Sequence, residues 1–106
     1  MTNVLPLHSI GVDATTVFTK LYDNASVSTG SNTNKMRAIG HAVDSIVIDC
    51  QITNKRIGVM VPDGASEFAI AIVNKDDIDN CEQIFLPLDE LKTSTLLKYM
   101  EIHFAK

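Results

Sequence analysis

The chain has 106 residues, of which 45% are hydrophobic and 21% are charged. This length allows one domain with one modest core over 1–106, and the composition excludes a disordered or fibrous protein. No apolar run approaches the roughly 20 residues that span a bilayer, and the first residues lack the basic and apolar regions of a secretory signal. We therefore expect a cytoplasmic protein with no membrane segment.

The net charge of −4 is distributed unevenly. Residues 1–62 carry five basic and four acidic side chains, whereas residues 63–106 carry four basic and nine acidic ones, a net charge of −5. Phosphate binding needs the opposite sign, because Lys and Arg displace counterions, so the acidic half argues against direct nucleic-acid binding. It favours a basic protein partner, and the alternative is that the charge only keeps a small protein in solution.

Two cysteines, Cys50 and Cys81, lack metal-binding or redox spacing. Small secreted domains are usually richer in cysteine, so we expect two free thiols in a reducing cytosol, with a structural disulfide as the alternative. Cys50 falls on an apolar strand face, which indicates a core residue.

The first predicted element is a helix over 13–25 that begins at Asp13 as its N-cap. Its apolar residues recur at three- and four-residue steps, which is one face of a helix. They are Ala14, Val17, Phe18, Leu21, Tyr22 and Ala25. The polar run over 26–35 predicts a surface loop, with a short strand at Ser26 to Ser28 as an option.

A hairpin and a third strand are predicted in the middle of the chain. Irregular chain or a helical turn over 36–44 precedes a strand at about 44–53, where Ile46, Ile48, Cys50 and Ile52 alternate with more polar residues. Asn54 and Lys55 form a tight turn into a strand over 56–61. We expect the hairpin to bury Ile46, Ile48, Ile52, Val59 and Val61. A Pro-Asp-Gly turn then leads into a strand over 67–73.

The last third predicts an acidic connection, a short strand and a helix. Residues 74–83 are rich in Asp and turn formers, and 84–88 form a strand that Pro87 confines to an edge or a strand end. Helical periodicity covers 89–104. Its candidate inward residues are Leu91, Thr95, Met100, Ile102 and Phe104. The expected fold is α+β, with a mainly antiparallel sheet of three to four strands flanked by an N-terminal and a C-terminal helix.

No complete catalytic constellation is present, so we expect no enzyme and no cofactor. The histidines, His8, His41 and His103, lack ligands at zinc-binding spacing, and no glycine-rich loop could hold a phosphate. Nucleophile-elbow glycines are absent around the serines and Cys50.

Four acidic residues, Asp76, Asp77, Asp79 and Glu82, crowd the predicted connection over 74–83. They do not form a calcium loop of the EF-hand type, because the central glycine is missing. Like charges at short range repel each other mildly even when screened, so the cluster does not stabilise the fold. We predict it as the site that meets a basic partner, with a solvated acidic turn as the alternative.

The order of elements gives one resemblance. A helix over 13–25 is followed by Val43–Asp49, Arg56–Val61, Phe68–Val73 and Ile84–Leu91, and this succession resembles the core of PD-(D/E)XK nucleases. In that family one strand begins with a metal-binding Asp, and the next carries Glu or Gln, a spacer and Lys. Asp44 would match that Asp, whereas Met60 and Pro62 stand where Glu or Gln and Lys belong. The chemistry needs those groups, so the resemblance implies a nuclease-like domain that does not cut, with Asp44 as its one remaining metal ligand.

The residues favour a small acidic, non-enzymatic protein-binding domain. We expect it to inhibit another protein, as toxin-immunity and phage anti-defence proteins do, and its partner to be a basic toxin or nucleic-acid-handling protein. The alternative is a catalytically inactive PD-(D/E)XK nuclease-like domain acting on or near nucleic acid.

Overall fold

The structure, a computed structural model, describes residues 4–22 and 26–104, except the side chains of residues 4–6, 78 and 80. The elements in chain order are α1 (Val4–Leu21), β1 (Val27–Ser31), α2 (Thr33–Ala38), β2 (Val43–Cys50), β3 (Lys55–Pro62), β4 (Glu67–Asn74), β5 (Asp77–Pro87), a 3-10 turn (Leu88–Glu90) and α3 (Thr93–His103). The predicted α+β class with terminal helices is confirmed, and the sheet has five strands rather than three to four.

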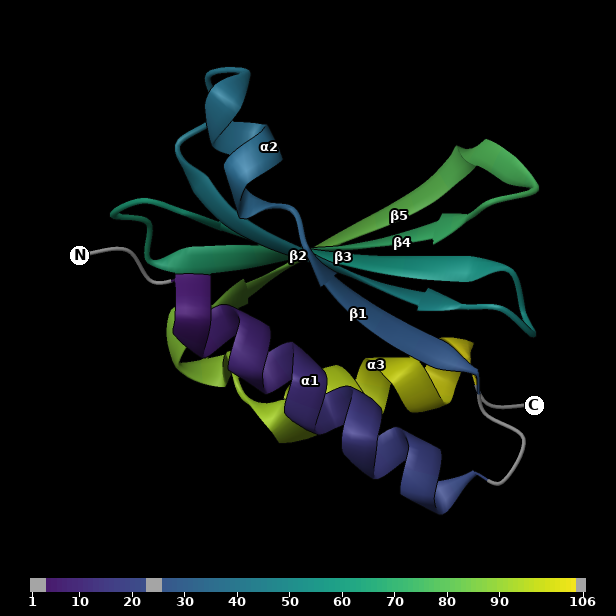
Figure 1. The fold of residues 1–106 in the computed structure, drawn as a ribbon. Coiled ribbons are helices and arrows are strands. Elements are labelled where there is room, and N and C mark those ends of the chain that lie inside the picture. Colours follow the sequence, from purple (N-terminus) through teal and green to yellow (C-terminus); the bar gives the residue numbers. More distant parts are fainter. Residues whose placement is uncertain (1–3, 23–25, 105–106) are drawn as a thin grey trace.

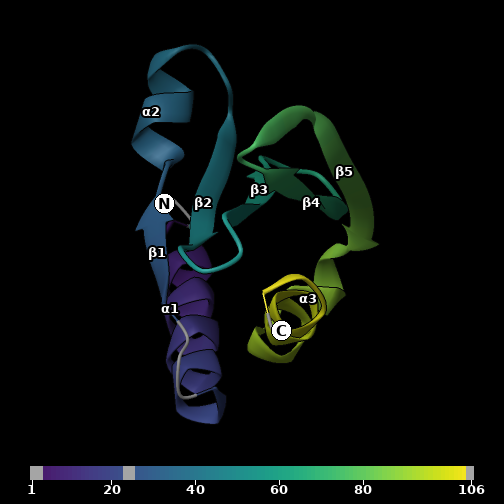
Figure 2. The same cartoon turned by 90° about the vertical axis from the view of Figure 1, so that its right-hand side faces the viewer.

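The five strands form an antiparallel meander in the order β1-β2-β3-β4-β5 (Figure 1). Both long helices lie on the same side of the sheet, with α1 beside β1 and β2 and α3 on the side of β3 to β5 (Figure 2). The short helix α2 stands at one end of β2, on the other side. Among the described residues no helix is both long and apolar enough to cross a membrane.

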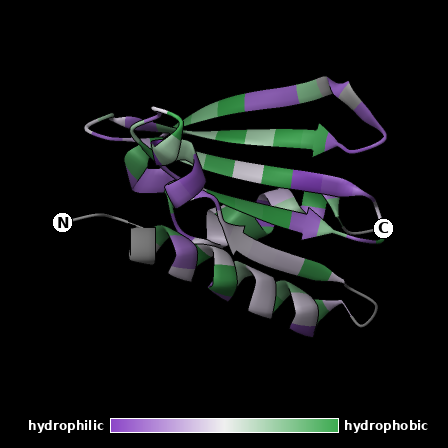
Figure 3. Ribbon diagram, turned by 45° about the horizontal axis from the view of Figure 1, so that its top comes forward, coloured by the Kyte–Doolittle hydropathy of each residue, from purple (hydrophilic) through white to green (hydrophobic). Residues whose placement is uncertain are grey.

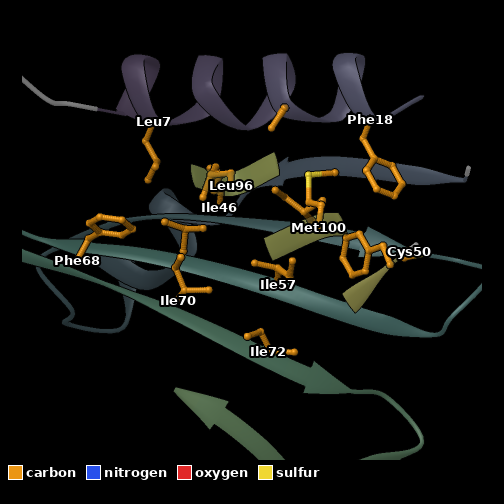
Figure 4. Close-up of a cluster of buried hydrophobic side chains, with 14 residues drawn as sticks. Leu7, Phe18, Ile46, Cys50, Ile57, Phe68, Ile70, Ile72, Leu96 and Met100 are labelled. Carbon is orange, nitrogen blue, oxygen red and sulfur yellow. The ribbon is translucent and has the colours of Figure 1, made fainter. Parts of the chain in front are cut away.

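The hydrophobic core lies between the two long helices and the sheet face that they cover (Figure 4). Successive strand residues point to opposite faces, so every second residue of β2, β3 and β4 enters this core. The fully buried members include Phe18 of α1, Met100 of α3 and Ile46, Ile57 and Ile70 of the sheet. Burial of such side chains contributes roughly 1.5–3 kcal/mol each.

Helix α1 begins at Val4, nine residues before the predicted N-cap. Asp13 is therefore an exposed residue inside the helix, and that prediction was wrong. Ala14 and Phe18 are buried as predicted, whereas Val17 and Leu21 are exposed. The inward face continues towards the N-terminus instead, through Leu7 and Gly11. The predicted helical residues 23–25 lie outside the described part of the chain.

Gly11 lets α1 approach the sheet closely. A Cβ atom at this position would lie 2.6 Å from Cδ1 of Ile46 and 2.9 Å from Cγ2 of Thr29. The hydroxyl of Thr29 hydrogen-bonds to the hydroxyl of Thr15 and also donates to the carbonyl of Gly11 at 3.2 Å. The small residue and the threonine pair thus join α1 to β1 and β2.

The predicted central hairpin is confirmed as the pairing of β2 with β3, with Ile46 opposite Val59 and Ile48 opposite Ile57. The first strand ends at Cys50 rather than at residue 53, and residues 51–54 form the turn. Asn54 has φ of 56°, which asparagine tolerates better than most residues. Ile52 lies in this turn and is 47% exposed, so its predicted burial was wrong.

The segment 74–83 is mostly strand rather than a connection. Strand β4 continues to Asn74, and β5 runs from Asp77 with an irregular register opposite Val73 and Asn74. The predicted helix over 89–104 is a 3-10 turn followed by α3 from Thr93. Ile102 was predicted to point inward and is 58% exposed.

Candidate functional site

Three of the four acidic candidates lie at the tip and first residues of the β4–β5 hairpin. Asp76 is in the turn, and Asp77 and Asp79 belong to β5; all three are exposed. We call them the acidic hairpin. Asn54 donates a hydrogen bond of 2.7 Å to Asp76. The salt bridges found in the described part of the chain involve none of the three carboxylates.

The fourth candidate, Glu82, lies opposite Ile72 on β4 and shares its face, the helix side of the sheet. With Lys55, Asn74 and His103 it lines an open cavity of about 120 Å³. Burial and the nearby Lys55 lower the pKa of His103, while Glu82 opposes that shift. Small-molecule sites usually have about 300–1,000 Å³, so this cavity suits a few water molecules better than a substrate. The residues that line this cavity are far apart in the sequence, so no spacing pattern could have predicted that they come together.

Asp44, the candidate metal ligand, is buried and paired with Arg37 of α2. The guanidinium donates a hydrogen bond of 3.0 Å to Asp44 and two, of 3.0 and 2.8 Å, to Asp63. These hydrogen bonds, first that of Asp63 and then that of Asp44, raise the pKa of Arg37. Arg37 in turn lowers the pKa of Asp63. The pairing ties α2 to one end of the β2–β3 ladder, where Asp44 and Asp63 adjoin the paired residues Val43 and Pro62.

The residues that the nuclease resemblance aligns do not converge. Asp44 lies opposite Val61, and Met60 lies opposite Ser45, so the side chains of Asp44 and Met60 point to opposite faces of the sheet. In the described ranges no group of three or more His, Cys, Asp or Glu side chains could hold a metal ion. Asp44 instead binds the Arg37 guanidinium, which it shares with Asp63.

A second ion-pair group lies at the other end of the sheet. Arg56 donates to both carboxylate oxygens of Asp49, at 2.7 and 3.3 Å, and the ammonium of Lys75 lies 3.1 Å away. Burial alone would raise the pKa of Asp49, but the hydrogen bonds from Arg56 and Lys75 hold it below its usual value. Both thiols are free, with Cys50 in the core as predicted and Cys81 exposed.

The face of the sheet opposite α1 and α3 carries an apolar surface that no described element covers in its middle. The strand registers place the polar residues Ser45, Asp49, Arg56, Glu67 and Gln83 on this face, together with seven residues that are apolar or glycine. We call these seven the open sheet face: Val47, Gly58, Met60, Ala69, Ala71, Val73 and Phe85. Phe85 is 61% exposed, Ala69 is buried, and the other five are partly buried. Helix α2 stands over one end of β2 (Figure 1).

Figure 3 looks obliquely onto this side, and the middle of β3 and β4 is green and white along its length. Residues pointing to both faces of these strands are therefore apolar or small. Strands with a single covered face usually alternate apolar and polar residues. The continuous apolar run Phe68–Val73 is the sequence signal that could have predicted a second contact surface.

Comparisons with known proteins give no relative. No protein-family model, curated protein or solved structure matches the chain. The PD-(D/E)XK resemblance therefore stays a prediction from the order of elements.

Proposed function

We propose that the chain is a non-enzymatic protein-binding domain that contacts protein through the open sheet face. The observation that carries the proposal is the apolar character of this face, where Phe85 is 61% exposed and Met60 and Val73 are partly buried. Covering apolar surface gains roughly 25 cal/mol per Å². Contiguous apolar patches on globular proteins commonly mark sites of protein contact.

Two of the carboxylates that could do chemistry already have cationic partners within the fold, which supports a binding rather than a catalytic role. Asp44 is held by Arg37, and Asp49 by Arg56 and Lys75. The cavity beside His103 is small for a substrate.

We also propose that this contact inhibits a basic protein in the cytoplasm, in the way that toxin-immunity and anti-defence proteins inhibit their targets. The acidic hairpin supports a basic partner, because its three carboxylates are exposed and form no salt bridge among the described residues. Such charges raise the rate of association with an oppositely charged surface more than they raise affinity.

A photo-crosslinking residue placed at Phe85 tests the contact surface inside cells that make the protein. We expect covalent adducts with protein from this position. The matched control is Ile102, an apolar residue of similar exposure on α3. Adduct formation from position 102 and none from position 85 would contradict the proposal.

Charge reversal tests the basic partner in the same assay. Changing the acidic hairpin to Lys should lower the yield of adducts with other proteins at low salt, and added salt should remove the difference because it screens charge. The control changes three exposed carboxylates elsewhere, Asp13, Asp89 and Glu90, to Lys. An equal loss in both variants would show that net charge alone matters.

A further inference from the structure

We infer that β5 takes up an extended segment of the basic partner as a sixth strand of the sheet. The inference rests on the proposed function for the sign of the partner's charge, and it adds the way in which that partner is held. In recognition of this kind the backbone hydrogen bonds give affinity and the side chains give specificity. The segment would also lie beside the exposed ring of Phe85, at the border of the open sheet face.

The outer edge of β5 is free in the described part of the chain. Among the described strands β5 pairs with β4 alone, and Figure 2 shows no described element beyond it. In an antiparallel ladder the backbone N–H and C=O groups of every second residue point away from the paired strand. The described backbone hydrogen bonds outside the ladders involve none of residues 77–87. The outward groups of β5 can therefore pair with a further strand.

The two edges of the sheet differ in length and protection. Strand β1 has five residues, whereas β5 has eleven. Natural proteins commonly protect an edge with Lys, Pro, a bulge or a very short strand. Strand β5 contains no Lys, its irregular register lies before Cys81, and Pro87 is its last residue. The stretch 81–86 between these two features keeps a regular register with β4 and has none of these protections.

The charge of β5 selects a basic segment over a second copy of the chain. Its charged residues are Asp77, Asp79 and Glu82, and its sequence contains no Lys, Arg or His. All three are exposed, and the salt bridges of the described residues involve none of them. Two β5 strands side by side would bring six carboxylates close together, which is unfavourable. Lys or Arg in the added strand would instead be attracted.

The order of residues along β5 predicts the pattern of the partner segment. The acidic residues lie in the first half of the strand, whereas Ile84, Phe85 and Leu86 lie near its end. Antiparallel pairs are the commoner arrangement. In that arrangement the first residues of the segment meet the apolar end of β5, and its later residues meet the acidic end. We therefore expect a segment that runs from Val or Ile residues to Lys or Arg residues.

Hydrogen exchange of single backbone amides, followed by NMR on the full chain, tests the inference. The probe is a ten-residue peptide with Val and Ile in its first half and alternating Lys and Thr in its second half. At saturating peptide and low salt, exchange of every second amide over 81–86 should slow tenfold or more, because these N–H groups donate to the peptide.

The matched control is the same peptide with a methyl group on every backbone nitrogen. It keeps the charge but donates no backbone hydrogen bond, and its methyl groups hinder the approach to β5. It should bind at least tenfold more weakly than the unmodified peptide. Equal binding of the two peptides would show that charge alone attracts them, and it would overturn the inference.

Two double variants test the acidic end of β5. Asp77→Lys with Asp79→Lys should weaken binding of the unmodified peptide tenfold or more at low salt, and added salt should reduce the difference. Asp13→Lys with Glu90→Lys makes the same change in net charge at exposed positions outside β5, and should weaken binding much less. Equal effects of the two variants would contradict a site on β5.

The exchange data also distinguish the other outcomes. Failure of the peptide to slow exchange in β5 would overturn the inference. Amides of β5 that exchange more slowly as the protein concentration rises, without peptide, would also overturn it, because a second copy would then occupy the edge. Both results leave the proposed function standing if position 85 crosslinks to a basic protein. Slowed exchange with peptide but no crosslinks from position 85 would keep the edge site and reject the contact through the open sheet face.

Discussion

The two faces of the sheet are both largely apolar, but the chain covers only one of them. The helix side carries residues with no exposed surface, such as Phe68 and Ile70, against α1 and α3. The open side carries small or half-exposed apolar residues and the exposed Phe85. The apolar residues of a strand thus show which positions need to be covered. They do not show whether the covering element belongs to the same chain.

Two phenylalanines on opposite faces give the largest contrast. Phe68→Ala removes a fully buried ring and should lower the free energy of unfolding by about 3–5 kcal/mol through lost transfer energy and a cavity. Phe85→Ala should cost about 1 kcal/mol or less, because most of its ring is already exposed. Urea unfolding measures both. Comparable losses would mean that the open face is part of the structural core.

The ion pairs at the two ends of the sheet form the second contrast. Arg37→Met leaves the carboxylate of Asp44 buried without its partner, and such a charge is strongly destabilising. Arg56→Met leaves Asp49 with Lys75 nearby, so we expect a smaller shift in the urea midpoint. The urea midpoint should therefore fall further for Arg37→Met than for Arg56→Met. A larger fall for Arg56→Met would show that the Asp49 ion pairs stabilise the fold more than the Arg37–Asp44 pair.

Two glycines test how closely each face is packed. Gly11→Ala should destabilise by about 1–2 kcal/mol, because the clash with Ile46 and Thr29 exceeds the gain of about 1 kcal/mol in helix propensity. At Gly58 on the open face the nearest atoms to an added Cβ lie 3.9 and 4.0 Å away, both in Ala71. Gly58→Ala should therefore be neutral or slightly stabilising. Thermal unfolding of the two variants at low concentration makes the comparison, and a stabilised Gly11→Ala would refute the close approach of α1.

A smaller effect concerns the pH dependence of the covered side. Burial, and then Lys55, lower the pKa of His103 in the folded chain, so the unfolded chain binds protons more readily. Stability should fall as pH decreases below about 6.5, the ordinary value for histidine. His103→Gln should flatten this part of the profile of unfolding free energy against pH. An unchanged slope would show that His103 titrates alike in both states.

The sequence was sufficient for the hairpin of β2 with β3, since its β-branched alternation and turns agree with the tertiary packing. It was insufficient for β5, where Asp and Asn have low strand propensity and pairing with the apolar β4 decides the structure. The early start of α1 was missed because Pro6 and Gly11 lower helix propensity, although both fit where they lie: Pro6 in the first turn and Gly11 against the sheet.

Only the part of the candidate site that is marked by crowded acidic residues could be predicted from the sequence. Asp76, Asp77 and Asp79 are exposed in the structure, as their crowding indicated. Glu82 could not be assigned to the cavity beside His103, because strand register decides which face a residue joins. The open sheet face required the topology, since only the arrangement of the helices shows which apolar face lacks cover.

Oxidation of two methionines by hydroxyl radicals tests the difference between the faces most directly. Met60 lies on the open sheet face and is half-exposed, whereas Met100 of α3 has no exposed surface. Met60 should therefore oxidise much faster than Met100. Equal rates for the two residues would contradict the account.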